Sequence, residues 1–343
     1  MMELAACTKE VSPSHPNQRL SVGSGLGLVN EGQTLRSLAD GRGFHIGVAV
    51  QARYLKEDDY KELLIAQCNT ITPENEMAFD VIHPDLDQYN FTPADTIAAF
   101  AQGNNVSLRG RSLVWEQQLP MWLTQGSFSK EELKQILHDH IYSVMGHYQG
   151  QVYAWDVVNE AIDTDGLFKN TIWLDGIGLE YIALSFRWAH EADPNALLFY
   201  NDSWGKNMDK KFMAVAVLAE GLLKQNVPIN GVGIQVNTSI DNPPNPQELS
   251  NIINRINALG LKVHITEIDV DINGGHGEST LKQQALIYYQ VVNACLTAAN
   301  CDTLMVGGLT DKYSQQPELA PFLFDKDGNP KPSYYAILSS LSQ

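Results

Sequence analysis

The chain repeats one unit, in which a short apolar run rich in β-branched residues precedes an amphipathic stretch. Eight runs predict strands at 44–50, 70–74, 107–114, 152–158, 196–200, 231–235, 262–268 and 303–308. Helices are predicted at 57–67, 130–148, 179–192, 210–224, 246–259, 281–298 and 334–341. Strands that alternate with helices form a parallel sheet, and eight repeats favour a closed barrel over an open sheet. The predicted fold is therefore an α/β protein, a single-domain (β/α)8 TIM barrel.

The predicted barrel occupies 40–343, and 1–39 is predicted to be a polar tether, rich in Ser, Gly and Pro over 8–27. Within it, Leu4-Ala5-Ala6-Cys7 has the small-residue pattern of a bacterial lipoprotein cleavage site, with Cys7 as the lipidated residue. A chance match of four small residues explains this pattern equally well. We expect a secreted or cell-surface protein, with Cys7 as a candidate anchor.

Several functional classes lack their signals in this sequence. No apolar run approaches the length of a membrane span. A net charge of −17 argues against a nucleic-acid partner, whereas a neutral polysaccharide is compatible with it. There is no GxGxxG after the first strand, no phosphate-binding loop and no CxxC pair. No lysine or HxH pair of the kind used by aldolases or metal-dependent hydrolases ends a strand. We expect a monomer without cofactor or metal.

Two glutamates occupy the positions where a TIM barrel carries its chemistry, at the carboxyl ends of strands. Glu160 follows the fourth predicted strand and Glu267 lies in the seventh, so the two face each other across the barrel mouth. Glycoside hydrolysis needs one carboxyl group that holds a proton and one that is ionised. A single glutamate at a strand end is more often the partner of a core arginine or lysine. Two in matching contexts favour catalysis.

Six motifs carry a resemblance to a known family: TPENEM at 72–77, LVWEQQLP at 113–120, WDVVNEA at 155–161, GVGIQ at 231–235, TEIDV at 266–270 and TDKYS at 310–314. Together they resemble glycoside hydrolase family 10, the retaining endo-β-1,4-xylanases, over about 40–342. The resemblance implies Glu160 as acid/base and Glu267 as nucleophile. The spacing of Cys295 and Cys301 allows a local disulfide, and it resembles a disulfide of many fungal members. Cys68 is expected to be a buried free thiol.

The same resemblance implies a set of substrate-binding residues. Asn159 would contact the hydroxyl beside the reacting carbon, and Glu74 and Asn75 would bind the next sugar on the non-reducing side. Trp115 would form an apolar wall, and Gln118 and Gln235 would add hydrogen bonds. For Trp115 the alternative is core packing. For Asn75 and Gln235 the alternative is that their side chains hydrogen-bond backbone groups of a loop at the rim of the barrel.

The chain departs from the family pattern where substrate should bind. Residues that stand where the family has a Lys, three His and two Trp are Ala78, Arg111, Glu116, Asn237, Gly307 and Gln315, and Trp204 stands in the altered segment after the fifth strand. We expect Arg111 and Glu116 to pair, the alternative being an Arg111 that binds a uronic acid. Asn237 takes the place of a histidine that bridges the nucleophile and the residue matching Asp269. We expect Asn237 to hydrogen-bond Glu267.

Three functions remain open at this point. The first is a retaining hydrolase of xylan or a related β-glycan, with its two carboxyl groups about 5–5.5 Å apart. The second is a catalytically weak carbohydrate-binding protein on the same fold, which needs neither glutamate. The third is a family member with altered specificity for a hexose, a uronic acid or an aryl glycoside.

Overall fold

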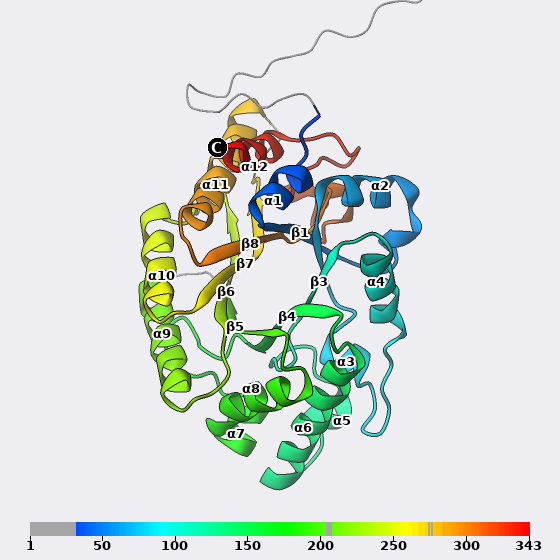
Figure 1. The fold of residues 1–343 in the computed structure, drawn as a ribbon, viewed down its shortest axis with the longest axis vertical. Helices are drawn as coiled ribbons and strands as arrows, with labels where there is room; N and C mark the ends of the chain where they lie inside the picture. The colour runs from blue at the N-terminus through cyan, green and yellow to red at the C-terminus, as the bar shows by residue number, and fades with distance from the viewer. Residues whose placement is uncertain (1–31, 204–207, 274, 276) are drawn as a thin grey trace, which may run out of the picture.

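The strands close into one parallel barrel, as the sequence predicts. The computed structural model describes residues 32–203, 208–273, 275 and 277–343. Each strand pairs with the next in chain order, and β8 pairs with β1 to close the ring (Figure 1). The strands are β1 (His45–Val50), β2 (Thr70–Pro73), β3 (Ser107–Gly110), β4 (Val152–Asn159), β5 (Leu197–Ser203), β6 (Gly231–Ser239), β7 (Lys262–Asp271) and β8 (Cys301–Val306).

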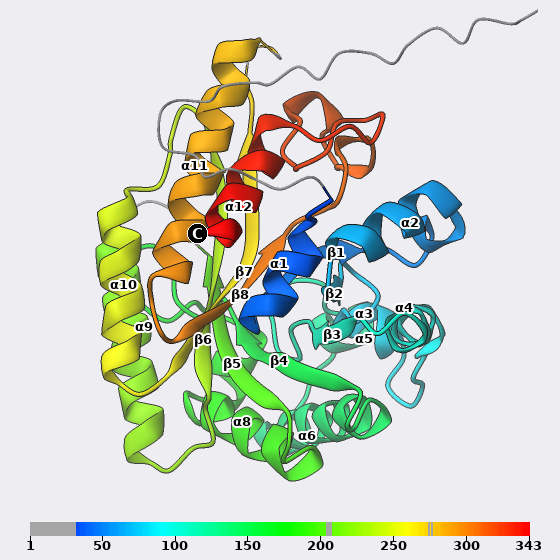
Figure 2. The same ribbon diagram turned by 45° about the horizontal axis from the view of Figure 1, so that its top comes forward.

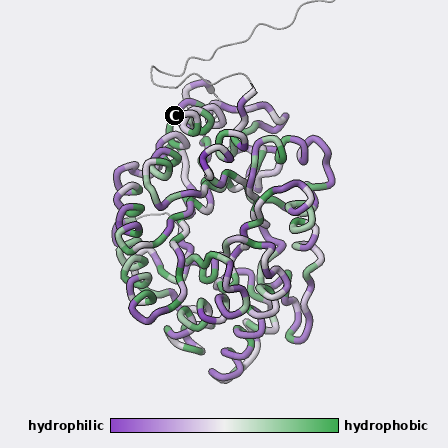
Figure 3. The backbone as a smooth tube through the Cα atoms, in the orientation of Figure 1, coloured by the Kyte–Doolittle hydropathy of each residue, from purple (hydrophilic) through white to green (hydrophobic). Residues whose placement is uncertain are grey.

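Helices surround this ring, and hydrophilic residues predominate on their outward edges (Figure 3). The α-helices among the described residues are α1 (Leu35–Arg42), α2 (Asp58–Gln67), α3 (Phe79–Ile82), α4 (Thr92–Gly103), α5 (Met121–Thr124), α6 (Lys130–His147), α7 (Ile172–Ile177), α8 (Glu180–Ala192), α9 (Met208–Lys224), α10 (Pro246–Ala258), α11 (Glu278–Leu296) and α12 (Pro332–Ser342). The predicted helices agree with their counterparts to within a few residues, but the sequence patterns predict none of α1, α3, α4, α5 and α7.

Local sequence signals set the helix ends. Ser129 and Glu132 form a capping box at the start of α6, each side chain bonding the other residue's backbone N–H. Asn245 caps α10, whose first residue is Pro246, as predicted. Gly260 follows α10 with φ of 76°, a left-handed conformation that glycine adopts without a Cβ clash.

The amino-terminal helix α1 packs on the barrel, beside α12 (Figure 2). Its residues Leu35 and Ala39 are fully buried, and Thr34 caps its first turn. The predicted boundary at residue 40 therefore falls inside a packed helix, because the burial of two apolar side chains holds this segment on the barrel. Residues 1–31 of the expected tether, including Cys7, lie outside the described residues.

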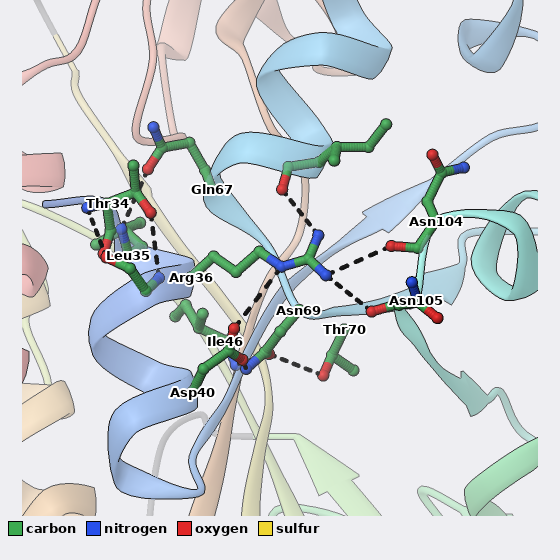
Figure 4. A network of polar contacts seen from close by, with 12 residues as sticks. Thr34, Leu35, Arg36, Asp40, Ile46, Gln67, Asn69, Thr70, Asn104 and Asn105 are labelled. Carbon is green, nitrogen blue, oxygen red and sulfur yellow. Dashed lines mark hydrogen bonds and ion pairs between the residues drawn. The ribbon is translucent and has the colours of Figure 1, made fainter. Parts of the chain in front are cut away.

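A polar network joins α1 to the amino-terminal face of the barrel (Figure 4). Arg36 donates hydrogen bonds to the carbonyl oxygens of Ile65, Asn104 and Asn105. Asn69 accepts from the N–H of Ile46 and donates to the Phe44 carbonyl. These bonds tie α1, α2, β1 and the segment before β3 together, so this face is closed by paired polar groups.

The barrel interior holds a buried ion pair below the carboxyl ends of the strands. Arg109 on β3 makes two hydrogen bonds of 2.6 Å to the carboxylate of Asp156 on β4. Its Nε also donates to Nδ1 of His264 at 3.4 Å. Because β3 and β7 are not neighbours in the ring, this last contact crosses the interior.

The three described cysteines match their predictions. Cys295 and Cys301 form a disulfide with an S–S distance of 1.96 Å, which joins the end of α11 to the start of β8. Cys68, at the carboxyl end of α2, is a buried free thiol, and burial raises its pKa to about 12. A thiol with so high a pKa is unreactive.

Candidate active site

A cavity of about 620 Å³ lies over the carboxyl ends of the strands, and its lining includes residues of β6, of β7 and of the segment that follows β8. The eight predicted site residues that line it are Glu74, Asn75, Arg111, Trp115, Gln118, Asn237, Glu267 and Asp269. Gly307 and Gly308, which follow β8, form part of its wall without side chains. The cavity has the position and size of a ligand site in this fold.

An irregularity in β7 aims Glu267 at this cavity. Ile234 of β6 pairs with Ile265, and the next residue, Gln235, pairs with Glu267, so Thr266 is an extra residue in β7. Side chains two apart share a face of a strand, and the bulge resets that alternation. Thr266 therefore faces the interior, where its hydroxyl donates to Asn201, and Glu267 still points into the cavity.

In the described part of the chain, the side chains of Gln235 and Arg111 contact the carboxylate of Glu267, both at Oε2. The amide of Gln235 donates at 3.3 Å, and the guanidinium of Arg111 lies 3.7 Å away. Among the described residues, Oε1 has no hydrogen-bond partner. The described side chains thus hold the carboxylate through one oxygen, in a residue that lines the cavity.

These contacts correct two sequence predictions. Arg111 does not pair with Glu116: it lies beside Glu267, and Glu116 instead binds Nζ of Lys169 at 2.9 Å. Asn237 does not hydrogen-bond Glu267 either. Its side chain is exposed, and it is the longer Gln235, the register partner of Glu267, that reaches the carboxylate.

Glu160 follows β4 in a strained backbone conformation. Its φ of 52° lies in the left-handed region, which a non-glycine residue seldom adopts. The N–H of Glu160 donates to the carbonyl of Asn201 at 2.9 Å and holds this turn in place. Such strain persists where surrounding structure enforces it, and it clusters at functional sites. The side chain is only 14% exposed, and Nζ of Lys169 lies 3.4 Å from its Oε2.

A chain of hydrogen bonds fixes Asn159 beneath the two glutamates. Thr266 donates to the amide oxygen of Asn201, and the amide nitrogen of Asn201 donates to Asn159 at 2.9 Å. This chain links β7, β5 and β4. A Cβ at Gly233 on β6 would lie 2.1 Å from the Asn201 amide oxygen, so the chain requires glycine there. Asn159 therefore has one orientation, although it does not line the cavity itself.

The opposite wall carries Glu74, Asn75 and Trp115. Glu74 accepts hydrogen bonds from Gln51 at 2.8 Å and from Gln315 at 3.2 Å. Asn75 accepts from the Gln118 amide at 2.9 Å. The indole of Trp115 is half-buried and lines the cavity, which favours the wall over simple core packing. Gln315, at a position where the family has a Trp, thus donates one of the hydrogen bonds that the Glu74 carboxylate accepts.

The cavity is strongly acidic. Its lining includes the carboxyl groups of Glu74, Glu267, Asp269 and Asp271, and Arg111 is the only lysine or arginine among the described residues of that lining. Burial, and then the charge of Glu267, raise the pKa of Asp269 well above its usual value, against the N–H of Gly307, which donates to it at 2.9 Å. Burial also raises the pKa of Asp271. An anionic substrate would meet repulsion here.

The structure also shows what sequence reasoning missed or cannot place. Lys169, which contacts both Glu116 and Glu160, was not predicted. A signal existed: a half-buried glutamate at 116 needs a cation, and Lys169 lies in the loop after β4. Trp204 lies outside the described residues.

Comparisons with known proteins agree with this geometry. The sequence profile of Glycosyl hydrolase family 10 matches residues 34–340. Endo-1,4-beta-xylanase B of Thermotoga neapolitana is 38% identical over 312 residues, which cover 88% of this chain and 90% of the relative. The crystal structure of native xylanase 10B from Thermotoga maritima superposes with a TM-score of 0.86 at 38% identity, covering 90% of this chain and 98% of that one.

A second structure, xylanase 10B from Thermotoga petrophila in complex with xylobiose, also has a TM-score of 0.86 at 38% identity and covers 92% of this chain and 99% of its own. Endo-1,4-beta-xylanase 1 of Humicola insolens is 33% identical over 311 residues, with 87% of this chain and 72% of the relative covered.

Proposed function

Because the chain belongs to glycoside hydrolase family 10, we propose that it cleaves internal β-1,4 linkages of xylan or a related β-glycan with retention of configuration. One observation carries this proposal. Glu160, directly after β4, and Glu267, within β7, are each held through one carboxylate oxygen, by Lys169 and by Gln235 respectively. Two separately supported carboxyl groups at the barrel mouth are what a double displacement requires.

In the first half of the reaction, Oε1 of Glu267 attacks the anomeric carbon while Glu160 gives its proton to the departing glycosidic oxygen. The bond from the anomeric carbon to that oxygen breaks as the bond to Glu267 forms. In the second half, Glu160 takes a proton from water, and the water oxygen displaces Glu267 from the sugar. We expect the two carboxyl groups to lie about 5–5.5 Å apart, the separation that leaves no room for water between them.

The remaining residues bind the sugar in this proposal. Asn159 contacts the hydroxyl beside the reacting carbon, and Glu74 and Asn75 bind the neighbouring unit, with Gln118 behind Asn75. Trp115 offers an apolar face to a pyranose ring. Arg111 donates to a neutral hydroxyl rather than to a uronic acid, because the cavity already holds four carboxyl groups.

The direct test is turnover of a polysaccharide panel and of an aryl β-xylobioside, with proton NMR of the first-formed sugar. We expect reducing ends from a neutral β-1,4-glycan and a β-anomer as first product. An α-anomer would show an inverting enzyme. Binding of oligosaccharide without turnover of either substrate would favour the second candidate, a carbohydrate-binding protein that retains the fold.

The proposal places the enzyme outside the cytosol, as a monomer. The disulfide between Cys295 and Cys301 supports an oxidising compartment. No described helix has the length and hydrophobicity of a membrane crossing. Fractionation of the native host locates the protein, and mass spectrometry of its amino terminus tests whether Cys7 carries lipid. Sedimentation tests the oligomeric state.

A further inference from the structure

The loop that follows β4 folds back on itself and places Lys169 beside the end of β4. An isolated bridge pairs Ile162 with Phe168, and the carboxylate of Asp163 accepts the N–H groups of Asp165 and Leu167. The N–H of Lys169 then donates to the carbonyl of Ala161 at 2.9 Å. The backbone of Lys169 is therefore fixed beside Glu160 by contacts that do not involve its side chain.

The ammonium group of Lys169 lies between two carboxyl groups. Its Nζ is 2.9 Å from Oε1 of Glu116 and 3.4 Å from Oε2 of Glu160, and its side chain is 23% exposed. Burial alone would lower the pKa of Lys169, but the hydrogen bond to Glu116 and the charge of Glu160 outweigh it and raise that pKa. Lys169 therefore stays protonated at the acidic to neutral pH at which a glycosidase works.

Among the described residues, two further titratable groups interact with this cluster, and each is paired or neutral. Asp202 on β5 binds Nζ of Lys211 on α9 at 2.6 Å and accepts a hydrogen bond from the hydroxyl of Tyr200. Tyr181 on α8 is buried, and burial raises its pKa well above the usual value. The charge that Glu160 experiences from this side is thus set by Lys169 and Glu116.

We propose that Lys169 is a positioning residue for Glu160 and that Glu116 is its counter-charge, so that the couple sets the pH range in which Glu160 holds its proton. The inference rests on the proposed role of Glu160 as acid/base. The ammonium holds one carboxyl oxygen and favours its charged form, which helps the step in which Glu160 acts as base. Glu116 limits this bias, so that Glu160 still delivers a proton in the first step.

The two single variants should act in opposite directions. K169M removes the cation, so Glu160 retains its proton to higher pH, and the alkaline limb of kcat/KM should move up by about 0.5–1 pH unit. E116Q leaves the cation uncompensated, so the same limb should move down by a similar amount. The double variant K169M/E116Q should return close to the wild-type limb, and K169R should keep it.

The experiment measures kcat/KM against pH for the purified full chain on an aryl β-xylobioside with a poor leaving group. Variant K210M is the matched control, because Lys210 pairs with Asp165 of the same loop at 3.6 Å while 63% exposed. Its alkaline limb should stay in place. The inference is overturned if the alkaline limbs of K169M and E116Q stay at the wild-type pH or move in the same direction. It is also overturned if the alkaline limb of K210M moves by as much.

A separate arm distinguishes this inference from the proposed function. E160A should lose most activity on the poor leaving group and much less on a dinitrophenyl glycoside, which needs no protonation. If E160A keeps full activity on both, the assignment of Glu160 is wrong and the proposed function fails. If E160A behaves as expected while the K169M and E116Q limbs coincide with wild type, only the role of Lys169 fails.

Discussion

Arg36 and Arg111 lie at opposite ends of the barrel, and their surroundings differ. The Arg36 guanidinium donates to three backbone carbonyl oxygens and also contacts Asp40 (Figure 4). The Arg111 guanidinium has, among the described residues, one ionic contact, to Glu267 at 3.7 Å. Paired donors hold the amino-terminal face together, whereas unpaired donors at the carboxyl face are available to a ligand. In a TIM barrel, the residues of the amino-terminal face serve stability, and those of the carboxyl-terminal face form the active site.

The interior between the two faces contains paired polar side chains that hold the strands in place. The Arg109–Asp156 pair and the chain from Thr266 through Asn201 to Asn159 both cross between strands. None of these side chains is part of the cavity lining, and Asn159 is the one among them that the proposed function places against the sugar. The comparison therefore predicts that variants near the cavity lose rate, and that variants below it lose stability.

The largest expected effect is that of E267A at the carboxyl face. Removing the nucleophile should lower kcat by about 10⁴-fold or more, equivalent to about 5.5 kcal/mol of transition-state stabilisation. The free energy of unfolding should change by less than about 1 kcal/mol, because the carboxylate is bound through only one oxygen. Kinetics on an aryl β-xylobioside and urea unfolding measure both quantities. A loss of stability comparable to the loss of rate would break the comparison.

The next effect is that of R109M in the interior. It leaves Asp156 buried without its two hydrogen bonds, which should cost about 3–5 kcal/mol of unfolding free energy. The double variant R109M/D156L restores a neutral interior and should recover much of that loss. Urea unfolding followed by fluorescence tests this. If R109M unfolds like wild type yet loses kcat, the interior contributes to catalysis in its own right.

A smaller effect is expected for N69A on the amino-terminal face. The substitution removes the side chain that pairs with the Ile46 N–H and with the Phe44 carbonyl, so both backbone groups lose this partner. It also removes the hydrogen bonds of Asn69 with Asp40 and Thr70. We expect a loss of about 1–3 kcal/mol in unfolding free energy, with kcat unchanged. The matched control is N242A at the rim of the cavity, an exposed asparagine whose loss should leave stability within about 0.5 kcal/mol.

How much of this comparison is readable from the sequence depends on how local each signal is. Strand–helix periodicity predicts the barrel, and the strand-end positions of Glu160 and Glu267 predict where the carboxylates lie. The extra residue Thr266 and the left-handed φ of Glu160 have no composition signal, because register and backbone strain are set by neighbouring strands. The pairing of Glu116 with Lys169 instead of Arg111 follows from a loop whose path no periodicity predicts.

The smallest expected effect sharpens the comparison at the carboxyl face and concerns D269N. The pKa of Asp269 is raised above its unfolded value by burial and by the charge of Glu267. The folded state therefore holds the proton more tightly than the unfolded state, so this group's contribution to stability falls as pH rises through that range. An asparagine keeps the acceptor for the Gly307 N–H and never ionises.

D269N should accordingly be more stable than wild type by roughly 1 kcal/mol near pH 7, with a difference that shrinks toward zero near pH 4, where the wild-type carboxyl is protonated as well. Thermal melts of both proteins between about pH 4 and pH 8 measure this. In an E267Q background the gain should be smaller, because the neighbouring charge that raises the pKa of Asp269 is gone. A gain that is independent of pH would mean that packing is responsible. A loss at pH 7 would mean that Asp269 pairs with a cation, and the carboxyl face would then be held together like the amino-terminal one.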